Sequence, residues 1–192
     1  GFGTSYAVVA ANTLATALGS DFGISKSQGF MESADFFMHV SGPSGYFFNF
    51  ADSWDLKDGD DSVLRAWFAA RTGDGLYFDK DFFEKPVQAG RFAGPGLVWI
   101  SEYSQQKVSE LPLNWRGNGA NPVAVFHGDK ANPGHYFLAV KGGRASISHG
   151  NMDAGTFVFE LNDVRWVIDP GNQPYYPLNR IGFKLAYYSQ DG

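Results

Sequence analysis

Three polar residues in the second half of the chain, His149, Asn151 and Asp153, have the spacing of one face of a β-strand. Side chains alternate between the two faces of a strand, so residues two apart point the same way. The three side chains could therefore contact one ligand. The same residue types also suit the end of a strand and a turn, in which Asn151 and Asp153 bond the local backbone. Residue types alone favour this second interpretation.

These residues belong to a longer pattern. It consists of Lys141-Gly142-Gly143, His149-x-Asn151-x-Asp153-Ala154-Gly155-Thr156-Phe157, Arg165-Trp166 and Asp169-x-Gly171. The pattern resembles the central β-domain of the heparinase II/III-like polysaccharide lyases. The opening residues 1–6 resemble the end of the motif that precedes the last helices of that family's α/α-toroid. The resemblance spans nearly the whole chain.

The resemblance implies an α+β fold, mainly β, in which helices from the end of an α/α-toroid precede an antiparallel β-sandwich. The implied domains are residues 1–43 for the toroid helices and residues 44–192 for the sandwich. The second domain would include short helical insertions and be incomplete at its C-terminus. Family membership would also place the protein in the bacterial periplasm or outside the cell.

The activity implied by the resemblance is cleavage of uronic-acid-containing acidic glycans by β-elimination. This reaction needs a base for the C5 proton, a donor for the departing O4, and polar or cationic groups that neutralise the uronate. The family assigns base and acid to a Tyr and a His of the toroid, which by family spacing fall before Gly1. His149 matches the β-domain histidine of the same cleft. We therefore expect an inactive fragment and a solvent-reachable His149, with glycosaminoglycan and alginate both open as substrates.

Further site residues follow from the same resemblance. Asn151, Tyr175 and Tyr176 would contact the sugar, although the tyrosine rings could instead anchor a Pro-bracketed loop. The reaction requires no cofactor, but several family members bind a structural zinc. Asp169 matches one zinc ligand, whereas Asn151, 18 residues earlier, stands where zinc-binding members have His. Asn is a poor zinc ligand, and Asp169 could equally be a turn carboxylate or support the cleft residues.

Composition restricts the partners. The 192 residues include 15 basic and 20 acidic side chains, a formal charge of −5, and no dense run of Lys or Arg, which argues against nucleic acid as a partner. No apolar segment approaches the ~20 residues that cross a bilayer, so we expect no membrane partner. The absence of Cys excludes a disulfide framework and thiolate chemistry. The expected partners are an acidic polysaccharide and the remainder of a longer chain.

The spacing of apolar residues predicts the elements that must position these side chains. Helices are expected over residues 4–18, 28–39 and 60–71, and a strand over residues 45–50. Residues 73–106 are ambiguous. Beyond Pro122, antiparallel strands are expected over residues 123–126, 136–141, 145–148, 156–161 and 164–168. Asn162-Asp163 fits a hairpin turn, and alternation puts Phe157 and Phe159 on the face opposite Val158.

The remaining histidines carry weaker signals. His39 follows an apolar run and is expected at a helix end, where the helix dipole would favour its charged form. His127 and His135 flank a turn, and loop histidines without carboxylate support are usually not metal ligands.

Two other function classes are open. A non-catalytic glycan-binding or structural β-domain is favoured by the absence of a complete acid and base set within these residues. A metal-dependent hydrolase that uses His149, Asp153 and Asp169 is less well supported, because no second histidine has metal-ligand spacing.

Overall fold

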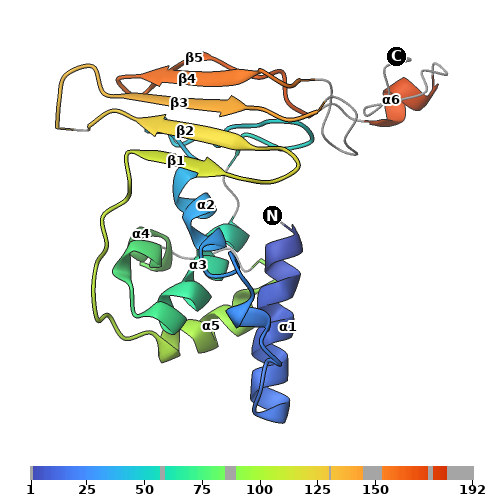
Figure 1. Ribbon diagram of the computed structural model, residues 1–192, viewed down its shortest axis with the longest axis vertical. Helices are drawn as coiled ribbons and strands as arrows, with labels where there is room; N and C mark the ends of the chain where they lie inside the picture. Colours follow the sequence, from blue (N-terminus) through green and yellow to red (C-terminus); the bar gives the residue numbers. More distant parts are fainter. Residues whose placement is uncertain are drawn as a thin grey trace. The chain divides into compact units, whose positions relative to one another are not determined.

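The computed structural model describes residues 2–56, 59–84, 90–129, 131–144, 153–172 and 175–180. The chain divides into two compact units, each built from two segments: a helical unit (Gly1–Met38 and Asp58–Leu111) and a sheet unit (His39–Lys57 and Pro112–Gly192). Helices and an antiparallel sheet occupy different segments (Figure 1), so the chain is α+β, as predicted. The units follow different ranges from the predicted domains, 1–43 and 44–192, which stay a prediction.

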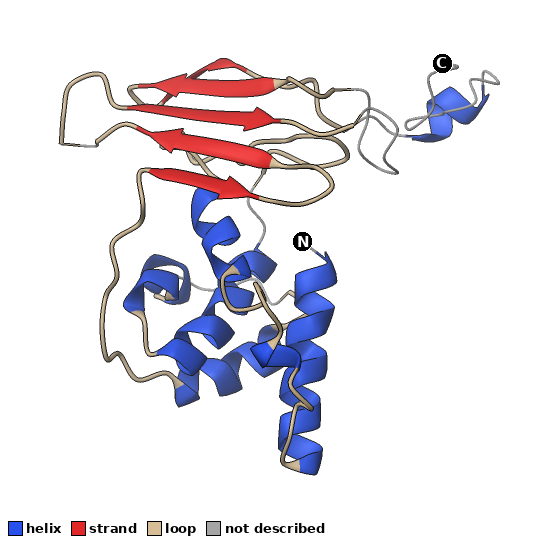
Figure 2. Cartoon of the chain, in the orientation of Figure 1, coloured by secondary structure: helices blue, strands red, loops and turns tan. Residues whose placement is uncertain are grey.

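Helices dominate the first half of the chain (Figure 2). They are α1 (Phe2–Leu18), η1 (Ile24–Lys26), α2 (Ser33–His39), α3 (Gly59–Thr72), η2 (Gly75–Tyr77), α4 (Lys80–Phe83) and α5 (Ala93–Glu102). The helices predicted over residues 4–18 and 60–71 are confirmed, while residues 28–39 are α-helical only from Ser33. The ambiguous stretch from residue 73 to residue 106 contributes helices among its described residues. None of the described helices combines the length and apolar character that a membrane span requires.

Glycines end the two longest helices. Gly19 after α1 has φ 74° and Gly73 after α3 has φ 66°, the left-handed conformation that glycine adopts without a steric penalty. Their amides donate to the carbonyls of Ala15 and Ala69, at 3.0 and 2.8 Å, and so close the last turn of each helix.

The core of the helical unit is centred on α3, which is buried on nearly all of its faces. Its fully buried residues include Leu64, Trp67 and Phe68 from α3 and Trp99 from α5. Helix α5 approaches α3 closely at a glycine, because a Cβ at Gly96 would lie 2.6 Å from a methyl group of Val63. The whole cluster comprises Val8, Ala11, Ala34, Phe37, Val63, Leu64, Ala66, Trp67, Phe68 and Trp99.

One five-stranded antiparallel sheet forms the centre of the sheet unit. Its strands pair in sequence order: β1 (Asn114–Gly117), β2 (Val123–His127), β3 (Tyr136–Lys141), β4 (Phe157–Leu161) and β5 (Val164–Val167). Strands β2 to β5 confirm the predicted antiparallel series; the strand predicted over residues 145–148 lies outside the described residues. Strand β1 was not predicted. Asn162 and Asp163, with φ 50° and 64°, form the two-residue turn between β4 and β5.

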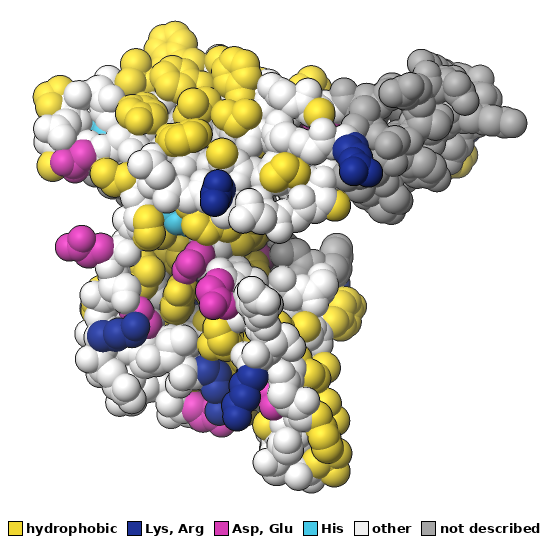
Figure 3. All heavy atoms as spheres, viewed as in Figure 1, with side chains coloured by type: hydrophobic (Ala, Val, Ile, Leu, Met, Phe, Trp, Pro, Cys, Tyr) yellow, Lys and Arg dark blue, Asp and Glu magenta, His cyan; other side chains and the backbone are white. Residues whose placement is uncertain are grey.

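The two faces of the sheet differ in exposure. Val125, Phe137, Ala139 and Val158 point to the inner face and are fully buried. The opposite, outer face is apolar yet exposed, and hydrophobic side chains gather over the sheet in Figure 3. Its more exposed members are Phe126 (38%), Tyr136 (39%), Phe157 (44%), Val164 (51%) and Trp166 (66%). Phe157 and Phe159 pair with outer-face residues and Val158 with Ala139, so the predicted alternation is confirmed.

The strand predicted over residues 45–50 is wrong. This segment forms only an isolated bridge, between Ser41 and Phe47. The amide of Phe47 donates to the carbonyl of Asp55 at 2.7 Å, and the carbonyls of Tyr46 and Phe47 accept hydrogen bonds from Arg165. The Arg165 side chain and the loop at Asp55 therefore bind the backbone groups of Tyr46 and Phe47 that would otherwise pair with a neighbouring strand. The described residues contain one sheet, and the predicted sandwich remains a prediction.

Candidate functional site

Two of the predicted site residues, His149 and Asn151, lie outside the described residues, which stop at Arg144 and resume at Asp153. The structure does describe the residues on both sides of this gap. They are the end of β3 with Gly142 and Gly143 on one side, and Asp153 to β4 on the other. These residues, which border the segment with His149 in the chain, are called the flanking residues below.

An ion pair joins the flanking residues on the two sides. The ammonium of Lys141, whose side chain is 3% exposed, contacts the carboxylate of Asp153. The second oxygen of Asp153 accepts a hydrogen bond from the amide of Ala51 at 3.1 Å. Backbone bonds reinforce the closure, since Gly155 N–H donates to Lys141 O at 2.8 Å and Lys141 N–H donates to Thr156 O at 3.0 Å. Asp153 is thus a structural anchor, as its position at a turn suggested.

Asp169 contacts one of the flanking residues, Thr156, and is almost fully buried. One carboxylate oxygen accepts the Thr156 hydroxyl at 2.6 Å, and the other accepts the amide of Gly171 at 2.7 Å. Its backbone carbonyl accepts the side-chain amide of Asn49 at 2.8 Å. Gly171 has φ 71°, and a Cβ there would overlap Asn49. Asp169 therefore closes a turn and links it to the start of β4.

These contacts bear on the zinc expected from the resemblance. Both oxygens of Asp169 already accept hydrogen bonds from protein groups. Among the described residues no group of three or more His, Asp or Glu side chains could hold a metal ion. The described part of the chain therefore shows no zinc centre, and Asp169 as a zinc ligand stays a prediction.

The two tyrosines predicted to contact sugar lie in a short helix, α6 (Tyr175–Arg180), where a loop was expected. Tyr176 is 71% exposed, so its ring does not anchor a buried loop. The guanidinium carbon of Arg180 lies 5.9 Å from the centre of the Tyr176 ring. The side chain of Tyr175 lies outside the described residues. Tyr176 is thus accessible to a ligand.

A second buried ion pair lies in the hairpin that precedes Asp169. Arg165 donates to Glu160 through Nε at 2.8 Å and approaches the same carboxylate through Nη2 at 2.7 Å. Glu160 is fully buried and also accepts the amide and the hydroxyl of Ser44, at 2.9 and 2.7 Å. Arg165 belongs to the pattern of the resemblance, and its contacts attach the segment 44–47 to the sheet.

Sequence reasoning missed a contact between two histidines in the sheet unit, of which His39 is fully buried. Nδ1 of His39 lies 3.1 Å from Nε2 of His127, and the His39 ring stacks on Trp115 at 5.3 Å between ring centres. Burial, followed by the charge of His127, lowers the pKa of His39 to about 4. His39 is the last residue of α2, as predicted, but the expectation that the helix dipole favours its charged form is wrong. A signal was available in the sequence: His127 lies two residues after Val125 and therefore shares its face of β2.

The two histidines that flank the turn after β2 do not come together as a pair. His127 contacts His39, whereas Nε2 of His135 lies 3.0 Å from Oδ1 of Asp163 at the surface.

The sequence matches no protein-family model and no curated protein.

Proposed function

We propose that this chain is part of a polysaccharide lyase that cleaves uronic-acid-containing glycans by β-elimination, and that His149 is its contribution to the active site. The observation that carries the proposal is the connection among the residues of the resemblance. Lys141 pairs with Asp153, Thr156 donates to Asp169, and Gly171 donates to the same carboxylate. Residues that are far apart in the pattern thus form one polar framework on both sides of the segment that contains His149.

In the proposed reaction the imidazole of His149 contacts the uronate carboxylate. Neutralising this carboxylate makes the C5 proton more acidic, which lowers the barrier to its removal. A base and an acid from the toroid of a longer protein remove the C5 proton and protonate O4. Asn151, Tyr175 and Tyr176 are proposed to contact the sugar, with glycosaminoglycan or alginate as the substrate and the periplasm or the cell exterior as the location.

The test compares a longer protein that includes the toroid with the 192-residue chain. Ultraviolet absorbance of the unsaturated product is followed on heparan sulfate, hyaluronan, chondroitin and alginate. We expect turnover by the longer protein, none by the 192-residue chain, and a loss of about 10²- to 10³-fold in His149→Ala, the usual cost of removing one group that stabilises developing charge. His135→Ala is the matched control, because His135 pairs with a surface carboxylate outside the framework, and it should retain full activity.

Two results would contradict the proposal. Turnover by the 192-residue chain would show that it needs no base or acid from the toroid. An inactive longer protein across the whole panel would favour the second candidate function.

That second candidate is a glycan-binding module without catalysis. The exposed aromatic residues of the outer sheet face favour it, because flat aromatic rings can stack on sugar rings. Tyr136, Phe157 and Trp166 are each at least 39% exposed on this face. Binding of the same glycans by the 192-residue chain that is lost in Trp166→Ala, without turnover by the longer protein, would support this function.

A further inference from the structure

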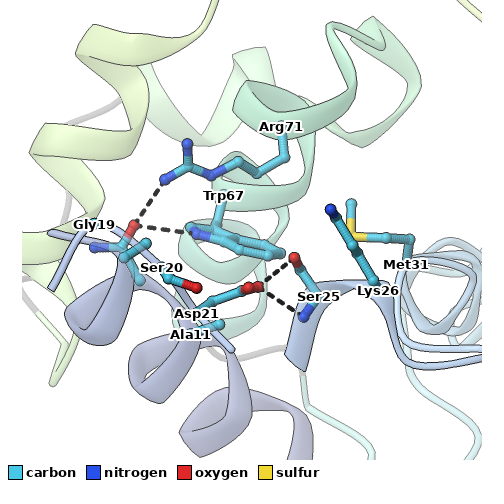
Figure 4. Close-up of a pocket in the computed structure, with 11 residues that line it drawn as sticks. Ala11, Gly19, Ser20, Asp21, Ser25, Lys26, Met31, Trp67 and Arg71 are labelled. Atoms are coloured by element: carbon cyan, nitrogen blue, oxygen red, sulfur yellow. Dashed lines mark hydrogen bonds between the residues drawn. The ribbon is translucent and has the colours of Figure 1, made fainter. Parts of the chain in front are cut away.

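The helical unit contains a pocket with a volume of about 490 Å³ (Figure 4). Its walls come from α1, from the turn and η1 that follow it, and from α3. The volume is in the range of small-molecule sites in proteins. The polar lining includes Asn12, Ser20, Asp21, Lys26 and Arg71. None of these residues belongs to the pattern on which the lyase proposal rests.

Arg71 is held in a fixed position at this pocket. Its Cζ lies 5.7 Å from the centre of the Trp67 ring, and its Nη2 donates to Oδ1 of Asn12 at 3.1 Å. Trp67 Nε1 donates to the same oxygen at 3.2 Å, so Asn12 ties the two side chains together. Glu102 approaches the same nitrogen only at 3.6 Å. Within the described part of the chain, Nη1 and Nε of Arg71 make no hydrogen bond and can receive an anion.

Lys26 supplies a second cation. It lines the pocket one residue after Ser25, and it has no ion-pair partner within 4.0 Å among the described residues. The side-chain amide nitrogen of Asn12 is likewise without a partner in this part of the chain, because both bonds to Asn12 use its oxygen. Together with Arg71, the pocket thus offers donors from α1, η1 and α3.

The carboxylate of Asp21 is fixed and charged. It accepts hydrogen bonds from the hydroxyl and amide of Ser25 and from the amide of Gly23. These bonds, with the charge of Lys26, hold its pKa at about 2. The lining contains two cations and one carboxylate, and Glu102 adds a second carboxylate 3.6 Å from Arg71. Asp21 also provides acceptor positions for hydroxyl groups.

We propose that this pocket binds a small sugar acid, a polyhydroxy compound with one carboxylate. The ligand carboxylate would pair with Arg71 and Lys26, and its hydroxyl groups would bond to Asp21 and to the amide of Asn12. A phosphate monoester carries about −1.5 to −2 at pH 7, so the carboxylates of Asp21 and of Glu102, which lies 3.6 Å from Arg71, would repel it more strongly than a single carboxylate. A neutral sugar would form no charge-assisted contact with Arg71 or Lys26.

The test is calorimetric titration of the 192-residue chain with glucuronate, with glucose and glucose 6-phosphate as the neutral and doubly charged comparisons. We expect saturable binding of glucuronate, at least about tenfold tighter than either comparison. Lys26→Met should weaken glucuronate binding by about tenfold, because it removes one charge-assisted contact. Lys80→Met is the matched control: Lys80 is 74% exposed on α4 and outside the pocket lining, so binding should not change.

Three results would overturn the proposal: no saturable binding of glucuronate, equal binding of glucose, or unchanged binding in Lys26→Met. The result is independent of the lyase proposal, since His149→Ala should leave glucuronate binding at this pocket unchanged. Loss of binding in His149→Ala would place the sugar acid elsewhere and would also reject the pocket.

Discussion

Arg165 fills the space beside the buried carboxylate of Glu160 and binds three groups at once. Besides Glu160, its guanidinium donates to the carbonyls of Tyr46 and Phe47, each at 2.8 Å. Glu160 in turn has its other bonds from Ser44, and a Cβ at Gly42 would overlap its carboxylate. Every strong polar group of this pair is therefore used, which is the condition under which a buried ion pair can persist.

Glu160→Gln should destabilise the protein strongly. The change leaves the Arg165 cation buried, at 9% exposure of its side chain, without its counter-charge. Breaking a buried pair from one side costs about 3–5 kcal/mol. Urea unfolding measures the change, and Glu84→Gln is the control, because Glu84 pairs with Lys80 on the surface and should cost less than about 1 kcal/mol. Equal stabilities of the two variants would contradict the role of the buried pair.

Lys141→Met should lower the melting temperature by leaving Asp153 without its counter-charge. A loss of about 3 kcal/mol corresponds to about 6–12 °C for a chain of this size. Thermal unfolding followed by circular dichroism measures the shift. The second variant, Lys141→Met with Asp153→Asn, should recover part of the loss, because no unpaired charge then stays buried. A double variant less stable than Lys141→Met would show that the charge pair is not the cause.

Stability should decrease as the pH falls from about 6.5 to about 4, because of His39. In the folded state burial lowers its pKa to about 4 from the usual 6.5. The unfolded chain therefore takes up a proton in this window before the folded chain does, and protonation favours unfolding. The expected loss is on the order of 3 kcal/mol, and above pH 7 the group contributes no pH dependence.

Denaturant unfolding at a series of pH values measures this loss. His39→Phe is the comparison, since phenylalanine can still stack on Trp115 but does not titrate. The quantity compared is the slope of stability against pH, because the variant also removes the bond to His127. The same slope in both proteins between pH 4 and 6.5 would contradict the assignment to His39.

Gly171→Ala should destabilise the turn that Asp169 closes. Gly171 has φ 71°, and a Cβ at this position would overlap the side chain of Asn49. The backbone conformation alone costs a non-glycine residue about 1–3 kcal/mol, and the overlap adds to this. Gly119→Ala is the control, because a Cβ at Gly119 meets no atom within 4 Å and the φ angle of Gly119 is not positive. Unfolding midpoints that fall equally in both variants would contradict this account.

Much of the sheet could be predicted from the sequence, because the residues that determine its strands and turns lie close together in the chain. The alternation of Phe157, Val158 and Phe159 defines two faces, and Asn162-Asp163 defines the turn that follows. A turn carboxylate was one of two open interpretations of Asp169, and its donor Gly171 is only two residues away. Where the partner of a residue lies close in sequence, its type and spacing were sufficient.

The errors have the opposite origin. The aromatic run from Tyr46 to Phe50 is typical of a strand, but the carbonyl of Phe47 accepts a hydrogen bond from Arg165, 118 residues later in the chain. His39 was expected to be charged because of its place at a helix end, but the histidine that it contacts, His127, is 88 residues away. Nothing local in either segment reveals the later residue that decides its structure. The strand β1 was missed for a related reason, since four residues ending in glycine acquire their pairing only from β2.

The two-segment origin of the sheet unit also determines when its contacts can form during synthesis. Residues 39–57 are synthesised before their partners: Asp169 follows Asn49 by 120 residues, and Arg165 follows Tyr46 by 119. Contacts between such distant residues require closure of a long loop, which slows folding. Until β5 has been made, the apolar side chains of Phe47, Phe48 and Phe50 lack the neighbours that hold their segment in place. Overproduction without a chaperone should therefore favour aggregation through this early segment.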